Sequence, residues 1–202
     1  MTSRPTLDFW FDFASTYSYL SAMRIEPLAE AAGVTLRWRP FLLGPIFAAQ
    51  GWSNSPFNLF PAKGKYMWRD IERRAQKSGL PVKRPAPFPQ NSLSAARIAL
   101  AGRDAGWTPA FARACFHLGF GQGKSIQDEA ILVEALRSAQ IDAQSALGLS
   151  KSEEVKGRLK AETELAKSLG IFGAPAFVTQ DGELFWGDDR LEDAIEWSRG
   201  GA

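Results

Sequence analysis

Strand-like sequence occurs only near the two ends of this 202-residue chain. Near the start, residues 7–13 form an apolar and aromatic run and residues 34–39 alternate apolar and polar side chains, so both predict strands. Near the end, residues 173–179 and 183–186 predict two more, joined by an Asp-Gly turn that favours a hairpin. Residues from 45 to about 160 contain no strand signal. The pattern predicts an α/β fold in which one small sheet is assembled from both ends of the chain.

The long middle of the chain has helical periodicity. Amphipathic helices are expected over 65–78, 93–105, 109–118, 128–139, 143–149 and 152–169. A helix from about 20 to 32 joins the first two strands into a βαβ unit, and another ends the chain near Trp197. Residues 41–61 are broken by glycine and proline and predict a long structured loop, a kind of segment that often carries binding residues. We therefore expect one domain from 1–44 with 161–202, and an inserted helical domain over 45–160.

Composition and charge exclude several classes of function. With 45% apolar and 12% aromatic residues the chain can bury a sizeable core, and its net charge of +2 is spread among mixed charges, so no nucleic-acid surface is expected. The single cysteine, Cys115, and single histidine, His117, leave no intrachain disulfide and no Cys/His metal cluster. No signal peptide or membrane-spanning run is recognisable, so the expected location is the cytoplasm, with no membrane partner.

The stretch Gly119-Phe120-Gly121-Gln122-Gly123-Lys124-Ser125 resembles a phosphate-binding loop at first sight. The Walker pattern needs glycine at position 118, where Leu118 stands, and it needs a preceding strand where a helix is expected. We interpret this stretch as a flexible connector between two helices.

Residues 12–20 link the first strand to the first helix, and Ser15 lies at the transition. A serine there is well suited to cap the helix, because its oxygen can accept a free backbone N–H of the first turn. The same end of a helix also favours an anion such as a thiolate or a carboxylate. Judged from the local pattern alone, capping is the commoner role.

The order of elements resembles a thioredoxin-like fold with the helical insertion of the disulfide oxidoreductase (DsbA) group. In that group a C-x-x-C motif lies where the first strand meets the first helix, and the equivalent residues here are Ser15-Thr16-Tyr17-Ser18. Serine stands at both cysteine positions, so dithiol–disulfide chemistry is excluded at this site.

A closer resemblance is to the 2-hydroxychromene-2-carboxylate isomerase family and, beside it, the kappa-class glutathione transferases. The resemblance is carried, in order along the chain, by residues 12–20, 63–66 with Arg69-Asp70, 88–92, 170–175 and 186–191. One departure is Thr16, which stands where the family usually has proline and supplies a backbone N–H that proline lacks.

The resemblance implies glutathione as cofactor. Ser15 would hydrogen-bond the glutathione sulfur and stabilise its thiolate, and Pro175 would be cis so that Ala174 presents its backbone to the cysteinyl part. The γ-glutamyl end would be held by Trp186, Gly187, Asp188 and Asp189. In this stretch a carboxylate would pair with the ligand's ammonium group, although simple capping of the last helix is the alternative for both aspartates.

The organic substrate is expected to lie against the inserted domain. Asn58 and Asn91 are the candidates for polar contacts, and Trp52, Phe57 and Trp10 for aromatic walls, although each is equally consistent with a turn residue or a core aromatic. Lys63 and Lys65 are either partners of a carboxylate or solvated side chains.

The function implied by the resemblance is glutathione-dependent isomerisation in aromatic catabolism. The thiolate adds to a ring-hemiketal substrate, 2-hydroxychromene-2-carboxylate, the ring opens, a bond rotates and the thiol leaves. The alternative is a kappa-like glutathione transferase, in which the adduct is the product, and a third possibility is a non-catalytic binding module. The resemblance also implies a homodimer and a small substrate derived from an aromatic or polycyclic compound.

Overall fold

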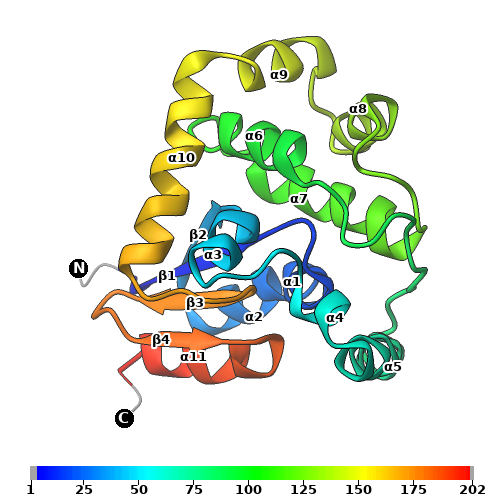
Figure 1. Cartoon of the computed structure of the whole chain (residues 1–202). Coiled ribbons are helices and arrows are strands. Elements are labelled where there is room, and N and C mark those ends of the chain that lie inside the picture. Colours follow the sequence, from blue (N-terminus) through cyan, green and yellow to red (C-terminus); the bar gives the residue numbers. More distant parts are fainter. Residues whose placement is uncertain (1–3, 201–202) are drawn as a thin grey trace.

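One mixed sheet is built from both ends of the chain, as the strand pattern predicts (Figure 1). The structure is a computed structural model, and it describes residues 4–200. Strand β1 (Thr6–Phe11) is parallel to β2 (Thr35–Pro40) and antiparallel to β3 (Ala176–Thr179), which pairs in turn with β4 (Leu184–Trp186). The strand order is therefore β2-β1-β3-β4. Together with the helices around it, this sheet forms the thioredoxin-like α/β fold that the sequence predicts.

The connection between β1 and β2 contains two helices where a single helix was expected. These are α1 (Thr16–Ala22) and α2 (Ile25–Ala32). The break is explained by Pro27, which has no N–H and whose ring would clash with the carbonyl of Met23 in a continuous helix. In the first turn of a new helix the same proline is tolerated. The prediction of one unbroken helix here is wrong.

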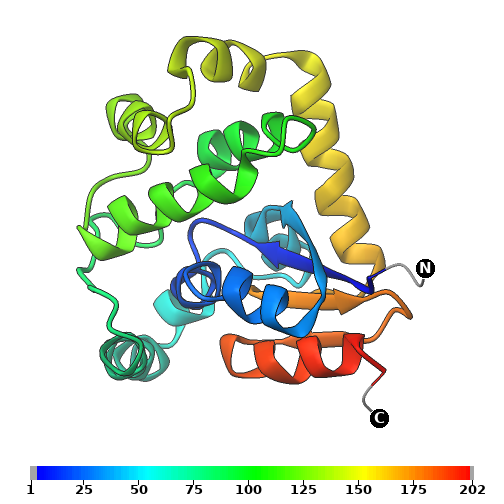
Figure 2. The same cartoon turned by 180° about the vertical axis from the view of Figure 1, so that it is seen from behind.

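Helices cover both faces of the sheet (Figures 1 and 2). On one face, α2 and α11 (Leu191–Ser198) pack against a core that includes Phe9 and Phe177, whose rings stack with centroids 5.6 Å apart. On the other face, a smaller cluster surrounds Trp10. Neighbouring residues of β1 point to opposite faces, so Phe9 and Trp10 enter different cores.

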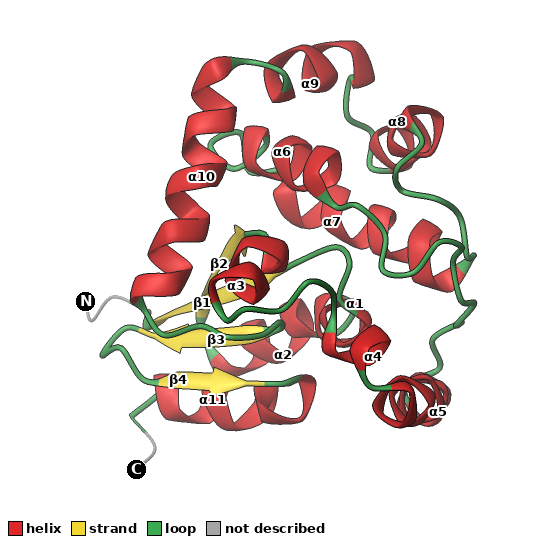
Figure 3. Cartoon of the chain, viewed as in Figure 1, coloured by secondary structure: helices red, strands yellow, loops and turns green. Residues whose placement is uncertain are grey.

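The middle of the chain is helical in the structure (Figure 3). It contains α4 (Pro56–Leu59), α5 (Pro61–Lys77), α6 (Leu93–Ala101), α7 (Thr108–Phe116), α8 (Glu129–Ser138) and α9 (Ala143–Ser150). The chain returns to the sheet through α10 (Glu153–Ser168), which runs across the predicted domain boundary at 160. The division into two domains stays a proposal, and its outermost residues, 1–3 and 201–202, lie outside the described part of the chain.

The stretch expected to be a loop, residues 41–61, contains helical turns. Helix α3 (Leu43–Ala49) and helix α4 both begin within it, each with a proline in its first turn, Pro45 and Pro56. A proline costs little there, because the N–H groups of a first turn have no partner within the helix. These prolines therefore mark helix starts, which the sequence pattern alone did not separate from loop.

The glycine-rich stretch after α7 is also more regular than expected. Helix α7 continues into a wider helical turn, His117–Gly121, whose Leu118 and Phe120 side chains are buried. A Cβ atom at Gly121 would lie 2.9 Å from Nδ1 of His117, so glycine makes room for this turn. The prediction of a flexible connector is therefore wrong for its first half.

Tyr19 connects α1 to the segment that follows α5. Its ring is fully buried, and its hydroxyl donates a hydrogen bond to the carbonyl oxygen of Pro81 at 2.7 Å. Replacing Tyr19 by phenylalanine keeps the ring and leaves that carbonyl without its partner. We predict that Tyr19→Phe lowers the free energy of unfolding by about 1–2 kcal/mol, measured by urea denaturation.

The matched control is Tyr66→Phe, since Tyr66 is largely exposed, and it should leave stability unchanged. Burial raises the pKa of Tyr19 from 10.0 to about 12. The stability contributed by its protonated hydroxyl is therefore complete below pH 10 and lost as the pH rises through 12, so the wild-type advantage over Tyr19→Phe should shrink in that interval. An equal stability of wild type and Tyr19→Phe at neutral pH would contradict this account.

Candidate active site

A cavity of about 1340 Å³ opens beside the ends of β1 and β4. It is larger than most small-molecule sites, which measure about 300–1,000 Å³. All the stretches that carry the family resemblance contribute to its lining, with lining residues that fall within 12–17, 63–74, 88–93, 172–174 and 186–190. Segments far apart in the sequence therefore meet at one place, and that place has room for a cofactor and a substrate together.

Ser15 lies at the base of this cavity and is 9% exposed. Its Oγ accepts a hydrogen bond from the backbone N–H of Ser18 at 3.1 Å, so it caps α1 as expected. The same hydroxyl donates to the carbonyl oxygen of Ala174 at 2.8 Å, and the peptide bond between Ala174 and Pro175 is cis. Ala174 lines the cavity, whereas Pro175 is buried behind it. The Ser15 hydroxyl thus has two roles: it caps α1 and it bonds the carbonyl of the residue before a cis-proline.

Asp12 holds together three segments around Ser15. Its Oδ1 accepts from the backbone N–H of Ala14 at 2.8 Å and its Oδ2 from that of Leu43, at the start of α3, at 2.7 Å. Burial raises the pKa of Asp12, and hydrogen bonds from both amides and from the Ser92 side chain act in the opposite direction. Sequence reasoning gave Asp12 no role, although an aspartate that bonds the amide two residues ahead is a familiar turn signal.

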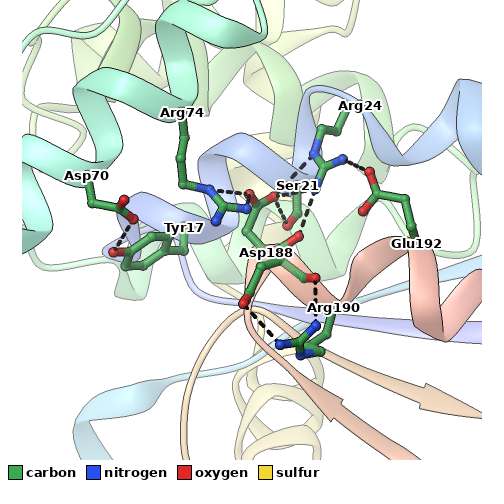
Figure 4. Close-up of polar contacts among 9 residues, drawn as sticks. Tyr17, Ser21, Arg24, Asp70, Arg74, Asp188, Arg190 and Glu192 are labelled. Atoms are coloured by element: carbon green, nitrogen blue, oxygen red, sulfur yellow. Dashed lines mark hydrogen bonds and ion pairs between the residues drawn. The ribbon is translucent and has the colours of Figure 1, made fainter.

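The predicted γ-glutamyl stretch forms a second wall. Trp186 is 52% exposed, with its ring 4.8 Å from that of Phe172, and Asp189 is exposed at the cavity. Gly187 has φ +107°, a conformation that favours glycine, and a Cβ there would lie 2.6 Å from Oδ1 of Asp189. Asp188 differs from Asp189, because its carboxylate is buried among two arginines and a serine (Figure 4).

The residues expected to meet a substrate are only partly brought together. Asn91, Trp52 and Phe57 line the cavity, and Asn91 Oδ1 also accepts from the N–H of Leu93 at 3.0 Å. Asn58 does not line it. The Asn58 amide instead donates to Asn54 Oδ1 and to the carbonyl oxygen of Phe88, each at 3.3 Å, and Asn54 faces the cavity.

Trp10 is not a wall of the cavity. Its side chain is fully buried in the smaller core, with the guanidinium carbon of Arg39 4.7 Å from its ring centroid. The prediction is wrong because a strand buried on both faces is apolar along its whole length. Its sequence therefore does not indicate which side chains reach a site and which enter a core. Of the two lysines, Lys63 lines the cavity and Lys65 does not.

Tyr17 and Asp70 form a further polar pair in the lining. The Tyr17 hydroxyl donates to Asp70 Oδ2 at 3.0 Å (Figure 4). Burial and the Asp70 carboxylate raise the pKa of Tyr17, so its hydroxyl stays protonated over the physiological range. This pair connects α1 to α5, and Tyr17 follows Ser15 by two residues. The sequence pattern does not indicate the pair, because its two partners lie on separate helices.

The structure also describes the residues considered for other chemistries. Among residues 4–200, no group of three or more His, Cys, Asp and Glu side chains is arranged to hold a metal ion. Over the same range, none of the helices is both long and apolar enough to cross a bilayer. Cys115 is fully buried, and burial raises the pKa of its thiol.

Comparison with known proteins gives consistent matches over nearly the whole chain. The family described as DSBA-like thioredoxin domain matches residues 6–195. A 2-hydroxychromene-2-carboxylate isomerase of Sphingobium xenophagum is 31% identical over 188 residues, covering 93% of this chain and 94% of that protein. Glutathione S-transferase kappa 2 of Caenorhabditis elegans is 28% identical over 210 residues, covering 98% and 93%. A solved structure of a 2-hydroxychromene-2-carboxylate isomerase superposes with a TM-score of 0.84, at 28% identity, over 96% of this chain and 94% of that one.

Gly64 allows α4 to pack directly on α5 at the rim of the cavity. A Cβ atom at Gly64 would lie only 2.2 Å from the carbonyl oxygen of Phe57. We predict that Gly64→Ala forces α4 outward and lowers the free energy of unfolding by about 1–3 kcal/mol, measured by urea denaturation.

The control is Gly157→Ala in α10, where an added Cβ meets nothing within 4 Å. That variant should gain about 0.5–1 kcal/mol, because alanine is the better helix former. A Gly64→Ala protein as stable as Gly157→Ala would show that α4 does not pack as described.

Proposed function

The chain belongs to the DsbA-like thioredoxin family and, within it, to the 2-hydroxychromene-2-carboxylate isomerase family, and from this premise we propose that it is a glutathione-dependent isomerase. The single observation that carries the proposal is the contact of Ser15 Oγ with the carbonyl of Ala174 before a cis-proline, at the base of a cavity of about 1340 Å³. With Ser15 and Ser18 at the positions of the DsbA cysteines, the site has no dithiol of its own and depends on a thiol supplied by a ligand.

Ser15 and Ala174 fit the cysteinyl part of glutathione. The Ala174 carbonyl oxygen has a second lone pair that can accept an amide N–H from the ligand. The backbone N–H of Ala174 is available as a donor. The Ser15 hydroxyl has a single proton, so on binding it would rotate away from the Ala174 carbonyl and donate to the sulfur instead. A hydrogen bond to the charged form of a group favours that form, so Ser15 would lower the thiol pKa. When bound, glutathione supplies a nucleophilic thiolate that adds reversibly to the substrate and leaves again.

The wall formed by residues 186–190 fits the γ-glutamyl end. We assign the ligand's ammonium group to the Asp189 carboxylate, which is exposed at the cavity, and the edge of that subsite to Trp186 and to the Gly187 backbone. The Asp188 carboxylate is not free for this role, because arginine and serine groups already occupy it.

The opposite side of the cavity fits an aromatic substrate with a carboxylate. Trp52 and Phe57 offer apolar faces, and Lys63 offers a positive charge. Asn91 offers an amide nitrogen, while its oxygen accepts from the N–H of Leu93. The protonated hydroxyl of Tyr17, two residues after Ser15, adds a polar group to the cavity lining. We propose that these residues orient the substrate and that the reaction takes place between them and Ser15.

A kappa-like glutathione transferase is the second candidate, favoured by the kappa relative that matches 98% of the chain. Ser15 would serve both reactions in the same way. The two differ in the fate of glutathione, which an isomerase returns unchanged and a transferase consumes. We also propose that the protein is a homodimer located in the cytoplasm.

The test is a calorimetric titration with glutathione followed by turnover of 2-hydroxychromene-2-carboxylate with and without glutathione. Saturable binding and isomerisation that requires glutathione, with no net loss of the thiol, is the expected result. Consumption of glutathione would favour the transferase, and absence of binding would overturn both readings.

We predict that Ser15→Ala lowers kcat on the order of 100-fold, as does the loss of one hydrogen-bond donor to a developing anion in other enzymes. Affinity for glutathione should fall by no more than about 5-fold, which corresponds to one ordinary hydrogen bond. Steady-state kinetics and calorimetry on the same preparation measure both quantities.

Loss of the α1 cap would by itself destabilise the variant by about 1 kcal/mol, so a matched cap variant is needed. Ser152→Ala removes the cap of α10, whose side chain accepts from the N–H of Val155 at 3.2 Å, away from the cavity lining. It should keep full activity. Equal losses of turnover and glutathione affinity in Ser15→Ala would indicate a binding role in place of thiol activation.

A further inference from the structure

Asp188 is held by a buried cluster of charged and polar groups (Figure 4). The Ser21 hydroxyl donates to its Oδ1 at 2.8 Å, and Arg24 donates to the same oxygen from Nη2 at 3.1 Å and from Nε at 3.3 Å. Arg74 donates to Oδ2 from Nη2 at 2.6 Å and from Nε at 3.1 Å. Asp188 itself is only 3% exposed. Both carboxylate oxygens of Asp188 therefore already accept hydrogen bonds from other residues of the protein.

The cluster joins three separate parts of the chain. Asp188 belongs to the turn after β4, Arg24 lies at the break between α1 and α2, and Arg74 lies on α5 of the helical block. Arg24 also donates to the backbone carbonyl of Asp188 at 2.7 Å, so it holds the main chain of the turn as well as the side chain. Glu192 pairs with Arg24 on the outer side. A shift of the turn would therefore separate the buried Asp188 carboxylate from its arginine partners, which is costly.

The turn held in this way carries the residue that faces the cavity. Asp189 follows Asp188 directly, and both line the cavity, as do Arg190 and Arg74. The Asp189 side chain is exposed there, whereas the Asp188 carboxylate is buried and bonded by the two arginines and Ser21. Gly187 precedes Asp188 in a backbone conformation that favours glycine, so the direction of the turn is set on both sides of Asp188. The position of the Asp189 carboxylate thus depends on the contacts of Asp188.

We propose that Asp188 is a positioning residue that acts through Arg24 and Arg74 to place Asp189, and so determines the preference for thiols that carry a γ-glutamyl group. This inference rests on the proposed glutathione function. The ligand end it concerns is a free α-amino acid group, whose ammonium needs one carboxylate at a defined place. Asp188 supplies no contact to the ligand; it fixes the turn that does.

The test compares two thiols, glutathione and the dipeptide Cys-Gly, which lacks the γ-glutamyl group, in wild type and Asp188→Asn. An asparagine turns an NH₂ group toward arginine donors and removes the anion that both guanidinium groups share, although Arg24 keeps its pair with Glu192. Removal of one partner of a buried charge pair is expected to weaken glutathione binding about 10- to 100-fold, measured by calorimetry. Affinity for Cys-Gly, measured at millimolar concentration, should stay within about 2-fold, because that ligand does not reach the turn.

Two further variants sharpen the result. Arg74→Gln removes the link to α5 and leaves Asp188 with Arg24 and Ser21. It should lower the affinity for glutathione relative to that for Cys-Gly, as Asp188→Asn does, but by a smaller factor. Asp104→Asn is the control, because Asp104 is bonded by Arg158 at 2.9 Å and 3.2 Å on the surface, away from the cavity lining, and it should change neither affinity.

The possible failures are distinguishable. If wild type does not bind glutathione, the proposed function fails and this inference with it. If wild type binds but Asp188→Asn binds glutathione equally well, only the positioning role is overturned. Equal losses for glutathione and Cys-Gly, with a lowered melting temperature, would reduce Asp188 to a general stabilising residue and also overturn it.

Discussion

The antiparallel pairing of β1 with β3 is the interaction on which the site depends. Leu7 pairs with Thr179 and Trp10 with Ala176, so the end of β1 lies beside the start of β3. The turn that leaves β1 carries Ser15, and the turn that enters β3 carries Ala174. Their hydrogen bond joins residues separated by 159 positions and follows directly from this register. A slip of one residue would turn every β1 side chain to the other face and separate the two groups.

Two buried carboxylates connect this sheet to the helical block that covers it. Asp12 holds the Ser15 turn to the start of α3, and Asp188 holds the turn after β4 to α5. Burial of a carboxylate is expensive unless hydrogen bonds or opposite charge compensate it. Asp188 has two arginine partners, whereas Asp12 has hydrogen bonds alone and its pKa is raised by burial. Such groups contribute to specificity of geometry more than to stability, since an apolar contact would be easier to bury. Both line the cavity, where the position of a few polar atoms matters most.

Much of this arrangement follows from local sequence. Alternation and apolar runs predicted the four strands, and the position of Ser15 between strand and helix predicted its capping role. The family resemblance added the cis bond before Pro175, which the structure contains. Local pattern failed where the deciding partner is distant. The contacts of Asp188 with Arg24 and Arg74 span 164 and 114 positions, and no periodicity indicates them.

The other differences have equally specific causes. Pro27 divides a helix that apolar spacing alone would continue. Pro45 and Pro56 lie in the first turns of short helices, whereas the sequence pattern predicts a loop there. Trp10 enters the core because β1 is buried on both faces. The most direct test of the account is a titration of the thiol of bound glutathione, followed by the ultraviolet absorbance of the thiolate. If Ser15 stabilises the thiolate, the bound thiol pKa lies well below the value of about 8.5 for a free thiol. A bound thiol that titrates at the free value would contradict the central claim.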